Sequence, residues 1–252
     1  MRLVLILLAV ITASAQTGKD ARRLLESISK AVRSSDNLRV EGTAIRDVTG
    51  EQAVHEETSF VLAVQGPLRL SFHANGPKPI LQVCDGTWLW NYSEDSNSYT
   101  KSAADMELCS PPFARWANLT EYLVDAKIIR NDHSEFEGHP QECEVIEATY
   151  EAPKPLLPEF PVVGRQTRTL CIDSVRHLVL REQLGTPPAV NQTGARRYSM
   201  TITYSRIELN ASLDASLFQI RPSERKSAGW RLSPDVSSTQ NHAASSDFQA
   251  RA

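Results

Sequence analysis

The chain of 252 residues lacks the features that would mark several common classes of protein. Its 27 Lys and Arg residues against 30 Asp and Glu residues give a formal net charge of -3, which offers no basic field for nucleic acid. It has no Cys-x-x-Cys pair, and its six histidines are scattered without the spacing of a metal site. Gly-x-Ser-x-Gly, His-Glu-x-x-His and glycine-rich phosphate motifs are also missing. We therefore expect no enzymatic activity, no metal, no cofactor and no nucleic-acid partner.

Long uncharged apolar runs are missing from the chain except at its start. There, Arg2 precedes an apolar run over residues 3–11, and Ala13-Ser14-Ala15 forms a small-x-small cleavage site. The run is too short for a permanent membrane span. It predicts a signal peptide over residues 1–15 and a mature, soluble and exported protein that begins near Gln16. Because the first cysteine is Cys84, we expect no lipid anchor at the cleavage site.

Cysteine is scarce, with four residues, but their number is even. In an oxidising compartment this predicts two disulfides, for which three connectivities exist. Proximity in the sequence favours Cys84 with Cys109 and Cys143 with Cys171.

What the chain does contain is one helical pattern followed by many strand patterns. Apolar residues recur at helical spacing over residues 19–33. Thereafter the period changes to that of strands, punctuated by turn signals such as Asp85-Gly86. We predict strands over residues 38–47, 58–65, 68–73, 80–84, 87–92, 98–101, 127–130, 142–150, 168–172, 177–182 and 198–209. The close spacing indicates antiparallel hairpins.

Aromatic residues make up only 7% of the chain, yet four of them lie between residues 88 and 99. On a strand, Trp88, Trp90 and Tyr92 would share one face, with Leu89 and Asn91 on the other. Two interpretations are open. The rings fill the core, as aromatic residues often do, or they line a cavity for a hydrophobic ligand.

Two segments interrupt the strand pattern. In residues 114–126, Trp116, Leu119, Tyr122 and Leu123 fall on one helical face, which predicts short helices. Residues 151–165 carry four prolines and predict a long apolar loop. That loop is either an insertion packed on its own domain or a rim, flap or partner-binding segment. We expect one domain over residues 16–222 and a disordered polar tail over residues 223–252.

The order of these parts resembles the LolA/LolB-like lipoprotein-carrier superfamily, which includes outer-membrane lipoprotein-sorting proteins. The similar stretches are LSFHANGPKPILQVCDGTWLWNYSEDSNSYTK and the closing LDASLFQIRP. The resemblance implies a mostly β (α+β) fold, an incomplete antiparallel β-barrel with an N-terminal helix and short lid helices over its concave face. It assigns the cavity wall to Leu70, Phe72, Trp88, Trp90 and Tyr92, and the lid to Trp116, Leu119 and Leu123.

The function that this resemblance implies is an exported carrier of lipid or of lipoprotein acyl chains across the periplasm. The partners would be those acyl chains and membrane-bound donor and acceptor proteins, and the carrier would be a monomer. The alternative is a periplasmic lipid-sensing regulatory or interaction protein with no transport role. One residue departs from the family, because Gly66 stands before Pro67 where the carriers have an arginine that holds the lid. The resemblance therefore does not say how the lid would open.

Overall fold

The computed structural model describes residues 2–49, 53–93, 98–105, 109, 116–152, 164–185 and 197–220, with the side chains of residues 2–17, 93, 152 and 197 left out. Most of the predicted proline-rich loop and the whole predicted tail lie outside the described residues. Cleavage after residue 15 stays a prediction.

A single long helix, α1 (Arg2–Arg33), opens the chain. It contains the predicted helix of residues 19–33 and extends it back to Arg2. Ala21, Leu25 and Ile28 are buried, and this spacing is that of one helical face packed on the sheet. Lys30 and Arg33 lie in the last turn, where positive charge is favourable. In the part of the chain that the structure describes, no helix is long and apolar enough to cross a membrane.

In the described residues eleven strands follow, and each contains or overlaps one of the predicted strands. Gly86 adopts a positive φ of 99° in the predicted Asp-Gly turn. The strands are β1 (Asn37–Thr49), β2 (Val54–Gln65), β3 (Arg69–Asn75), β4 (Ile80–Asp85), β5 (Trp88–Ser93), β6 (Ser98–Ala103), β7 (Leu123–Phe136), β8 (His139–Ala152), β9 (Gly164–Asp173), β10 (Leu178–Gly185) and β11 (Arg197–Leu209). A short 3-10 helix, η2 (Ala215–Phe218), ends the described fold.

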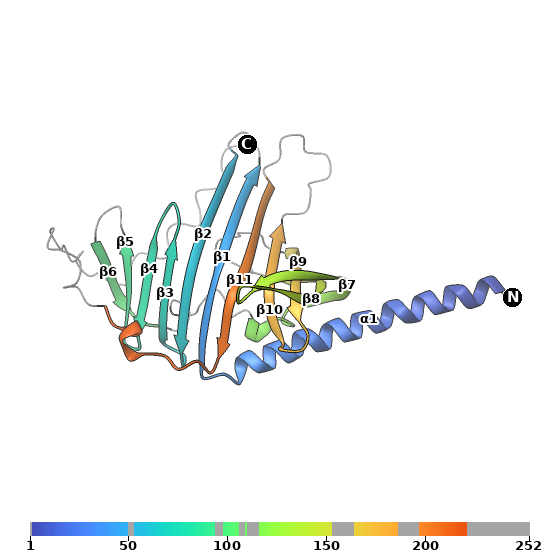
Figure 1. Cartoon of the computed structure of the whole chain (residues 1–252), viewed down its shortest axis with the longest axis horizontal. Helices are drawn as coiled ribbons and strands as arrows, with labels where there is room; N and C mark the ends of the chain where they lie inside the picture. Colours follow the sequence, from blue (N-terminus) through green and yellow to red (C-terminus); the bar gives the residue numbers. More distant parts are fainter. Residues whose placement is uncertain are drawn as a thin grey trace.

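All the strands belong to one sheet in the order β6-β5-β4-β3-β2-β1-β11-β10-β9-β8-β7. Neighbours in this order pair antiparallel, and β1 joins the two halves by pairing with β11. The sheet is strongly twisted, with β6 at one edge and β7 at the other (Figure 1). The predicted fold class, a mostly β open half-barrel with an N-terminal helix, is confirmed.

The sheet has two faces with different surroundings. Leu62 lies opposite both Val40 and Phe72, so these three side chains share a face. This face, which we call the inner face, packs with α1 in one continuous core that includes Leu25 and Ile28. The other face, the outer face, carries polar residues together with exposed apolar ones such as Val61, which is 39% exposed. Complete burial of a large apolar side chain on the inner face contributes about 1.5–3 kcal/mol.

Candidate functional site

Residues 116–119 cover the centre of the inner face, and we call them the cover segment. Trp116 is 1% exposed and Leu119 is fully buried. The Trp116 ring meets the Tyr204 ring of β11 edge to face, with 4.8 Å between their centroids. Tyr204 also contacts Phe60 of β2, and Phe60 contacts Phe72 of β3, each at 6.3 Å between centroids. The cover segment therefore lies on an aromatic surface formed by three strands.

Side chains from α1 and from the sheet hold the backbone of the cover segment. The Ser29 hydroxyl accepts a hydrogen bond from the Leu119 amide at 3.1 Å, and the Arg33 guanidinium donates to the Ala117 carbonyl. Both of these side chains belong to α1. From the sheet, the Tyr150 hydroxyl donates to the Leu119 carbonyl at 2.9 Å. Hydrogen bonds thus attach the cover segment both to α1 and to β8.

A buried ion pair lies beside these contacts. Arg168 of β9 donates to Glu182 of β10 at 2.5 Å, and their side chains are 2% and 0% exposed. The second oxygen of Glu182 accepts a hydrogen bond from the Tyr204 hydroxyl at 2.6 Å. The Arg168 guanidinium lies 5.4 Å from the centroid of the Tyr150 ring. The two tyrosines that contact the cover segment therefore both contact this ion pair as well.

Burial and charge act in opposite directions on Arg168. Burial alone would lower the pKa of its guanidinium, but the adjacent carboxylate of Glu182 raises that pKa above its ordinary value. Arg168 is therefore charged at any physiological pH. Its Nε atom has no hydrogen-bond partner, so the pair is incompletely satisfied.

The residues of the predicted cavity wall do not share one face of the sheet, and their role in ligand binding stays a prediction. Leu70 lies opposite Cys84, which in turn lies opposite Leu89. Because successive residues of a strand point to opposite faces, Trp90 points away from the face that carries Leu70. The structure places Leu70 and Phe72 on the inner face, and Trp88, Trp90 and Tyr92 on the outer face.

On the outer face the aromatic residues form their own cluster with a lysine. The rings of Tyr92 and Tyr99 lie 4.8 Å apart between centroids. The ammonium group of Lys101 lies 3.8 Å from the Trp88 ring centroid and 4.8 Å from that of Trp90. Such contacts stabilise rings that are partly exposed to water, as Trp88 is at 38%.

The predicted lid residues do not lie on one helix. Residues 116–118 are in 3-10 conformation, and Leu123 is the first residue of β7. Between them, Tyr122 has a positive φ of 57°, which ends any helix. Trp116 and Leu119 are nevertheless buried against the inner face, whereas Leu123 belongs to an edge strand.

The four cysteines are paired as sequence proximity favoured. Cys84 of β4 bonds to Cys109, and Cys143 of β8 bonds to Cys171 of β9. Cys109 precedes the cover segment, so the first disulfide fixes that part of the chain to the inner face of β4.

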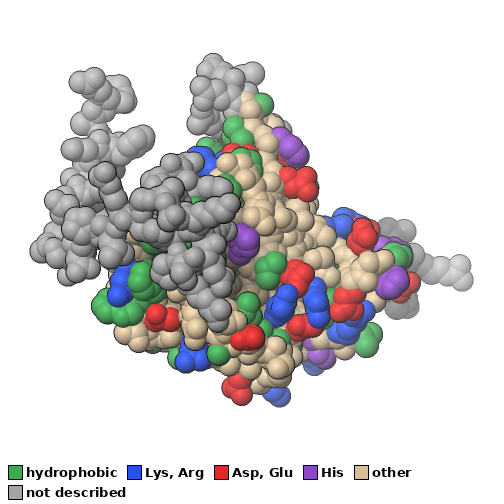
Figure 2. Space-filling view, turned by 60° about the vertical axis from the view of Figure 1, so that its left-hand side comes forward, with side chains coloured by type: hydrophobic (Ala, Val, Ile, Leu, Met, Phe, Trp, Pro, Cys, Tyr) green, Lys and Arg blue, Asp and Glu red, His purple; other side chains and the backbone are tan. Residues whose placement is uncertain are grey.

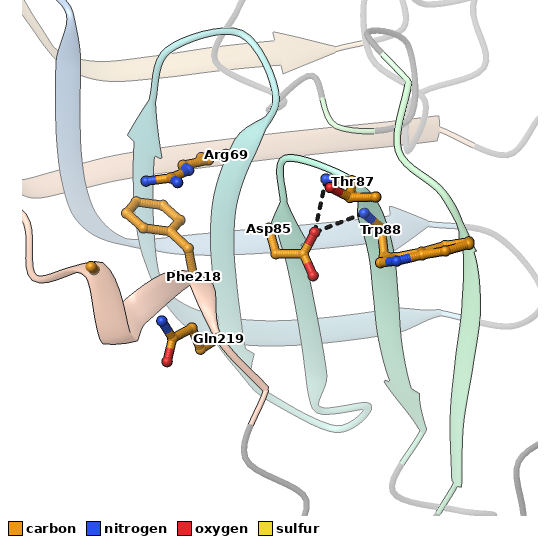
Figure 3. Close-up of a pocket in the computed structure, with 7 residues that line it drawn as sticks. Arg69, Asp85, Thr87, Trp88, Phe218 and Gln219 are labelled. Atoms are coloured by element: carbon orange, nitrogen blue, oxygen red, sulfur yellow. Dashed lines mark hydrogen bonds between the residues drawn. The ribbon is translucent and has the colours of Figure 1, made fainter.

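A pocket of 330 Å³ opens on the outer face, where η2 packs beside the β4–β5 turn (Figure 3). Its lining includes the buried ring of Phe218, the amide of Gln219, and the charged side chains of Arg69 and Asp85. It is the second candidate site, and it lies on the opposite face of the sheet from the cover segment.

Asp85 is fixed in this pocket by the turn that it begins. Its Oδ1 atom accepts hydrogen bonds from the amides of Thr87 at 2.8 Å and Trp88 at 2.7 Å, and its Oδ2 atom accepts one from the Trp90 indole at 3.3 Å. Partial burial would raise the pKa of Asp85, but these hydrogen bonds and the charge of Lys101 lower that pKa below its ordinary value. The carboxyl group is therefore ionised at neutral pH.

Neither site has the composition of a metal centre. Within the residues that the structure describes, no group of three or more His, Cys, Asp and Glu side chains could hold a metal ion. Charged side chains of both signs are interspersed over the described surface seen in Figure 2.

Comparison with known proteins gives neighbours of low similarity. No family model matches the sequence, and the search of curated proteins finds no relative. Among solved structures, the chain is similar to the Mycobacterium tuberculosis lipoprotein LppX, with 12% identity and a TM-score of 0.38 over 77% of this chain and 98% of that one. A LolA superfamily protein from Nitrosomonas europaea matches with 11% identity and a TM-score of 0.32 over 79% and 97%.

The Pseudomonas aeruginosa MucA/MucB complex matches with 13% identity and a TM-score of 0.33 over 80% of this chain and 61% of the other. This chain thus spans less than two thirds of that one. The LolA superfamily, which the sequence resembles, is represented among these structures. At these TM-scores the likeness is too distant to assign residues of the site. The fold is described by the strand pairing of this chain itself.

Proposed function

We propose that the protein binds a hydrophobic ligand, a lipid or the acyl chains of a lipoprotein, on the inner face of the sheet and carries it through the periplasm. The observation that supports this is the cover segment. It hides an aromatic surface, and a hydrogen bond between the Tyr150 hydroxyl and the Leu119 carbonyl links its backbone to the sheet.

Displacement of the cover segment would expose apolar side chains that a ligand can cover again. Tyr204 would lose its ring contact with Trp116, and an acyl chain would replace that contact on the surface that Tyr204 forms with Phe60 and Phe72. Burial of apolar area contributes about 25 cal/mol per Å², so such a site holds its ligand without ion pairs. Ser29 and Arg33 attach the cover segment to α1. We therefore expect the cover segment and α1 to move together away from the sheet.

The test compares a charge on the inner face with the same charge on the outer face. Phe72→Asp places a carboxylate beside Phe60, whereas Trp90→Asp places one on the opposite face of the same sheet. Binding of a dansylated undecanoic acid to the full exported protein is measured by fluorescence, and co-purified lipid is identified by native mass spectrometry. We expect Phe72→Asp to weaken probe binding by at least tenfold and Trp90→Asp to leave it within twofold.

Circular dichroism must show that both variants are folded before their binding is compared. A parent protein that neither carries acyl mass nor binds the probe would overturn the proposal. An equal loss of binding in the two folded variants would show that the inner face is not the site.

A second variant tests whether the cover segment controls access. Tyr150→Phe removes the hydroxyl that holds Leu119 and keeps the ring beside Arg168. A hydrogen bond of this kind contributes about 1 kcal/mol, so the open form should become roughly fivefold more populated. We expect a faster association rate for the probe and faster amide exchange at residues 116–120. Tyr92→Phe, on the outer face, is the matched control, and equal rates in the two variants would contradict this role of Tyr150.

A further inference from the structure

Arg69 and Asp85 face each other across two paired strands but do not pair with each other. They are direct partners in the β3–β4 register, on the outer face of the sheet. Opposite charges in such positions lie close enough to interact and normally do so. Among the described ion pairs, however, none joins these two residues. Arg46 of β1, by contrast, reaches its direct partner Glu56 of β2 at 2.6 Å.

The reason is that each side chain is held by a different neighbour. Asp85 turns towards the β4–β5 turn, where Thr87 and Trp88 donate to it. Arg69 donates through Nη1 to Gln65 at 3.0 Å, across the β2–β3 turn. Its side chain lies beside the Phe218 ring of η2, with Asp85 on the other side of the pocket (Figure 3).

Both charged groups keep hydrogen-bonding capacity towards the pocket. The Oδ1 atom of Asp85 already accepts two amide hydrogens, but its Oδ2 atom accepts only the long bond from Trp90. The guanidinium of Arg69 uses Nη1 and retains Nε and its second Nη atom as donors. Gln219 and Thr87 add neutral polar groups to the lining.

We propose that this pocket binds a small zwitterion, in which a primary ammonium group pairs with Asp85 and a carboxylate or phosphate pairs with Arg69. A guanidinium presents two parallel donors to such an oxyanion, and a carboxylate accepts directly from an ammonium. A ligand with one charge would satisfy one side of the pocket and leave the other uncompensated. The volume of 330 Å³ suits a head group or a single amino acid.

The experiment is titration calorimetry on the full chain with two zwitterions, O-phosphoethanolamine and β-alanine. Ethanolamine and methyl phosphate, which each carry one of the two charges, are the matched ligands. We expect at least one zwitterion to bind at least tenfold more tightly than either single-charge compound. The stronger zwitterion identifies the oxyanion that Arg69 prefers.

Two variants test the residues, and one controls for charge on the same face. Arg69→Gln removes the guanidinium, and Asp85→Asn removes the carboxylate charge but keeps an oxygen for the turn amides and an Asn-Gly turn. Arg39→Gln removes another outer-face arginine, one that pairs with Glu41. We expect each pocket variant to weaken zwitterion binding at least tenfold and Arg39→Gln to leave it unchanged.

A phosphoethanolamine group has two sources, which vesicles distinguish. Co-flotation with vesicles containing phosphatidylethanolamine, but not with phosphatidylcholine vesicles, would assign the ligand to a lipid head group. Binding of the free compound without co-flotation would assign it to a soluble molecule.

The proposal is overturned if neither zwitterion binds the folded parent, if single-charge compounds bind equally well, or if both pocket variants bind as the parent does. Acyl-probe binding on the inner face should be the same in Arg69→Gln and in the parent. Failure of this pocket is therefore distinguishable from failure of the carrier function.

Discussion

Replacing Glu182 with leucine is expected to lower the free energy of unfolding by about 3–5 kcal/mol, because it leaves the buried charge of Arg168 without its partner. Arg168 is 1% exposed, so water cannot replace the lost carboxylate. Tyr204 would lose the acceptor of its hydroxyl in the same variant. Urea unfolding followed by circular dichroism measures the difference.

The matched control removes both charges at once. In Arg168→Met/Glu182→Leu no charge remains buried, so we expect most of the lost stability to return. Glu147→Leu, which breaks the exposed pair with Lys127, should have a far smaller effect than Glu182→Leu. A double variant as unstable as Glu182→Leu would mean that the destabilisation comes from packing and not from the unpaired charge.

Loss of the disulfide between Cys84 and Cys109 is expected to cost about 3.5 kcal/mol of stability, from the entropy that the crosslink removes from the unfolded chain. The two cysteines are 25 residues apart in the sequence, and both are buried. Cys84→Ser/Cys109→Ser should also speed amide exchange in the cover segment, because Cys109 no longer fixes the preceding chain to β4.

The second disulfide provides the comparison for this effect. Cys143 and Cys171 are 28 residues apart, so their loss should cost a similar amount. Their strands, β8 and β9, remain joined by a long ladder of backbone hydrogen bonds. We therefore expect little change in exchange at residues 116–119 in Cys143→Ser/Cys171→Ser, and an equal change in both variants would contradict the role assigned to Cys109.

The strands of this fold were predictable because their signals are local. Alternating apolar residues and turns such as Asp85-Gly86 act over a few residues, and all eleven predicted strands are present. Which face of a strand is buried, however, depends on its pairing with other strands and not on nearby residues alone. Trp88, Trp90 and Tyr92 do share a face, but their orientation depends on Leu89, which lies opposite Cys84 on the inner face.

In the cover segment and the residues after it, the spacing of apolar residues predicts a helix that continues to Leu123, which the structure does not have. Trp116, Leu119 and Leu123 have helical spacing, but the same spacing suits a 3-10 turn that leads into a strand. The positive φ of Tyr122 separates the 3-10 turn from β7. Tyrosine rarely adopts a positive φ, so the sequence does not predict this break.

The buried ion pair was missed for a related reason. In the sequence Arg168 and Glu182 each stand at the end of an apolar stretch, where a charged residue usually meets water. They become diagonal neighbours only when β9 pairs with β10, which places Arg168 opposite Leu184 and Glu182 opposite Leu170. A charged residue in phase with buried apolar ones is the signal that would have found them.

The seam between β1 and β11 determines the order in which this chain can fold. All other strand pairs join sequence neighbours, whereas this one pairs Leu38 with Leu209. The two arrays of hairpins, β1–β6 and β7–β11, can form early from local contacts. Pairing of β1 with β11 closes a very large loop, and the entropy that this closure costs makes the step slow. Until the last strand arrives, β1 presents an unpaired edge to other chains. During synthesis from the N-terminus, the chain is accordingly most prone to aggregation before β11 has been made and has paired with β1.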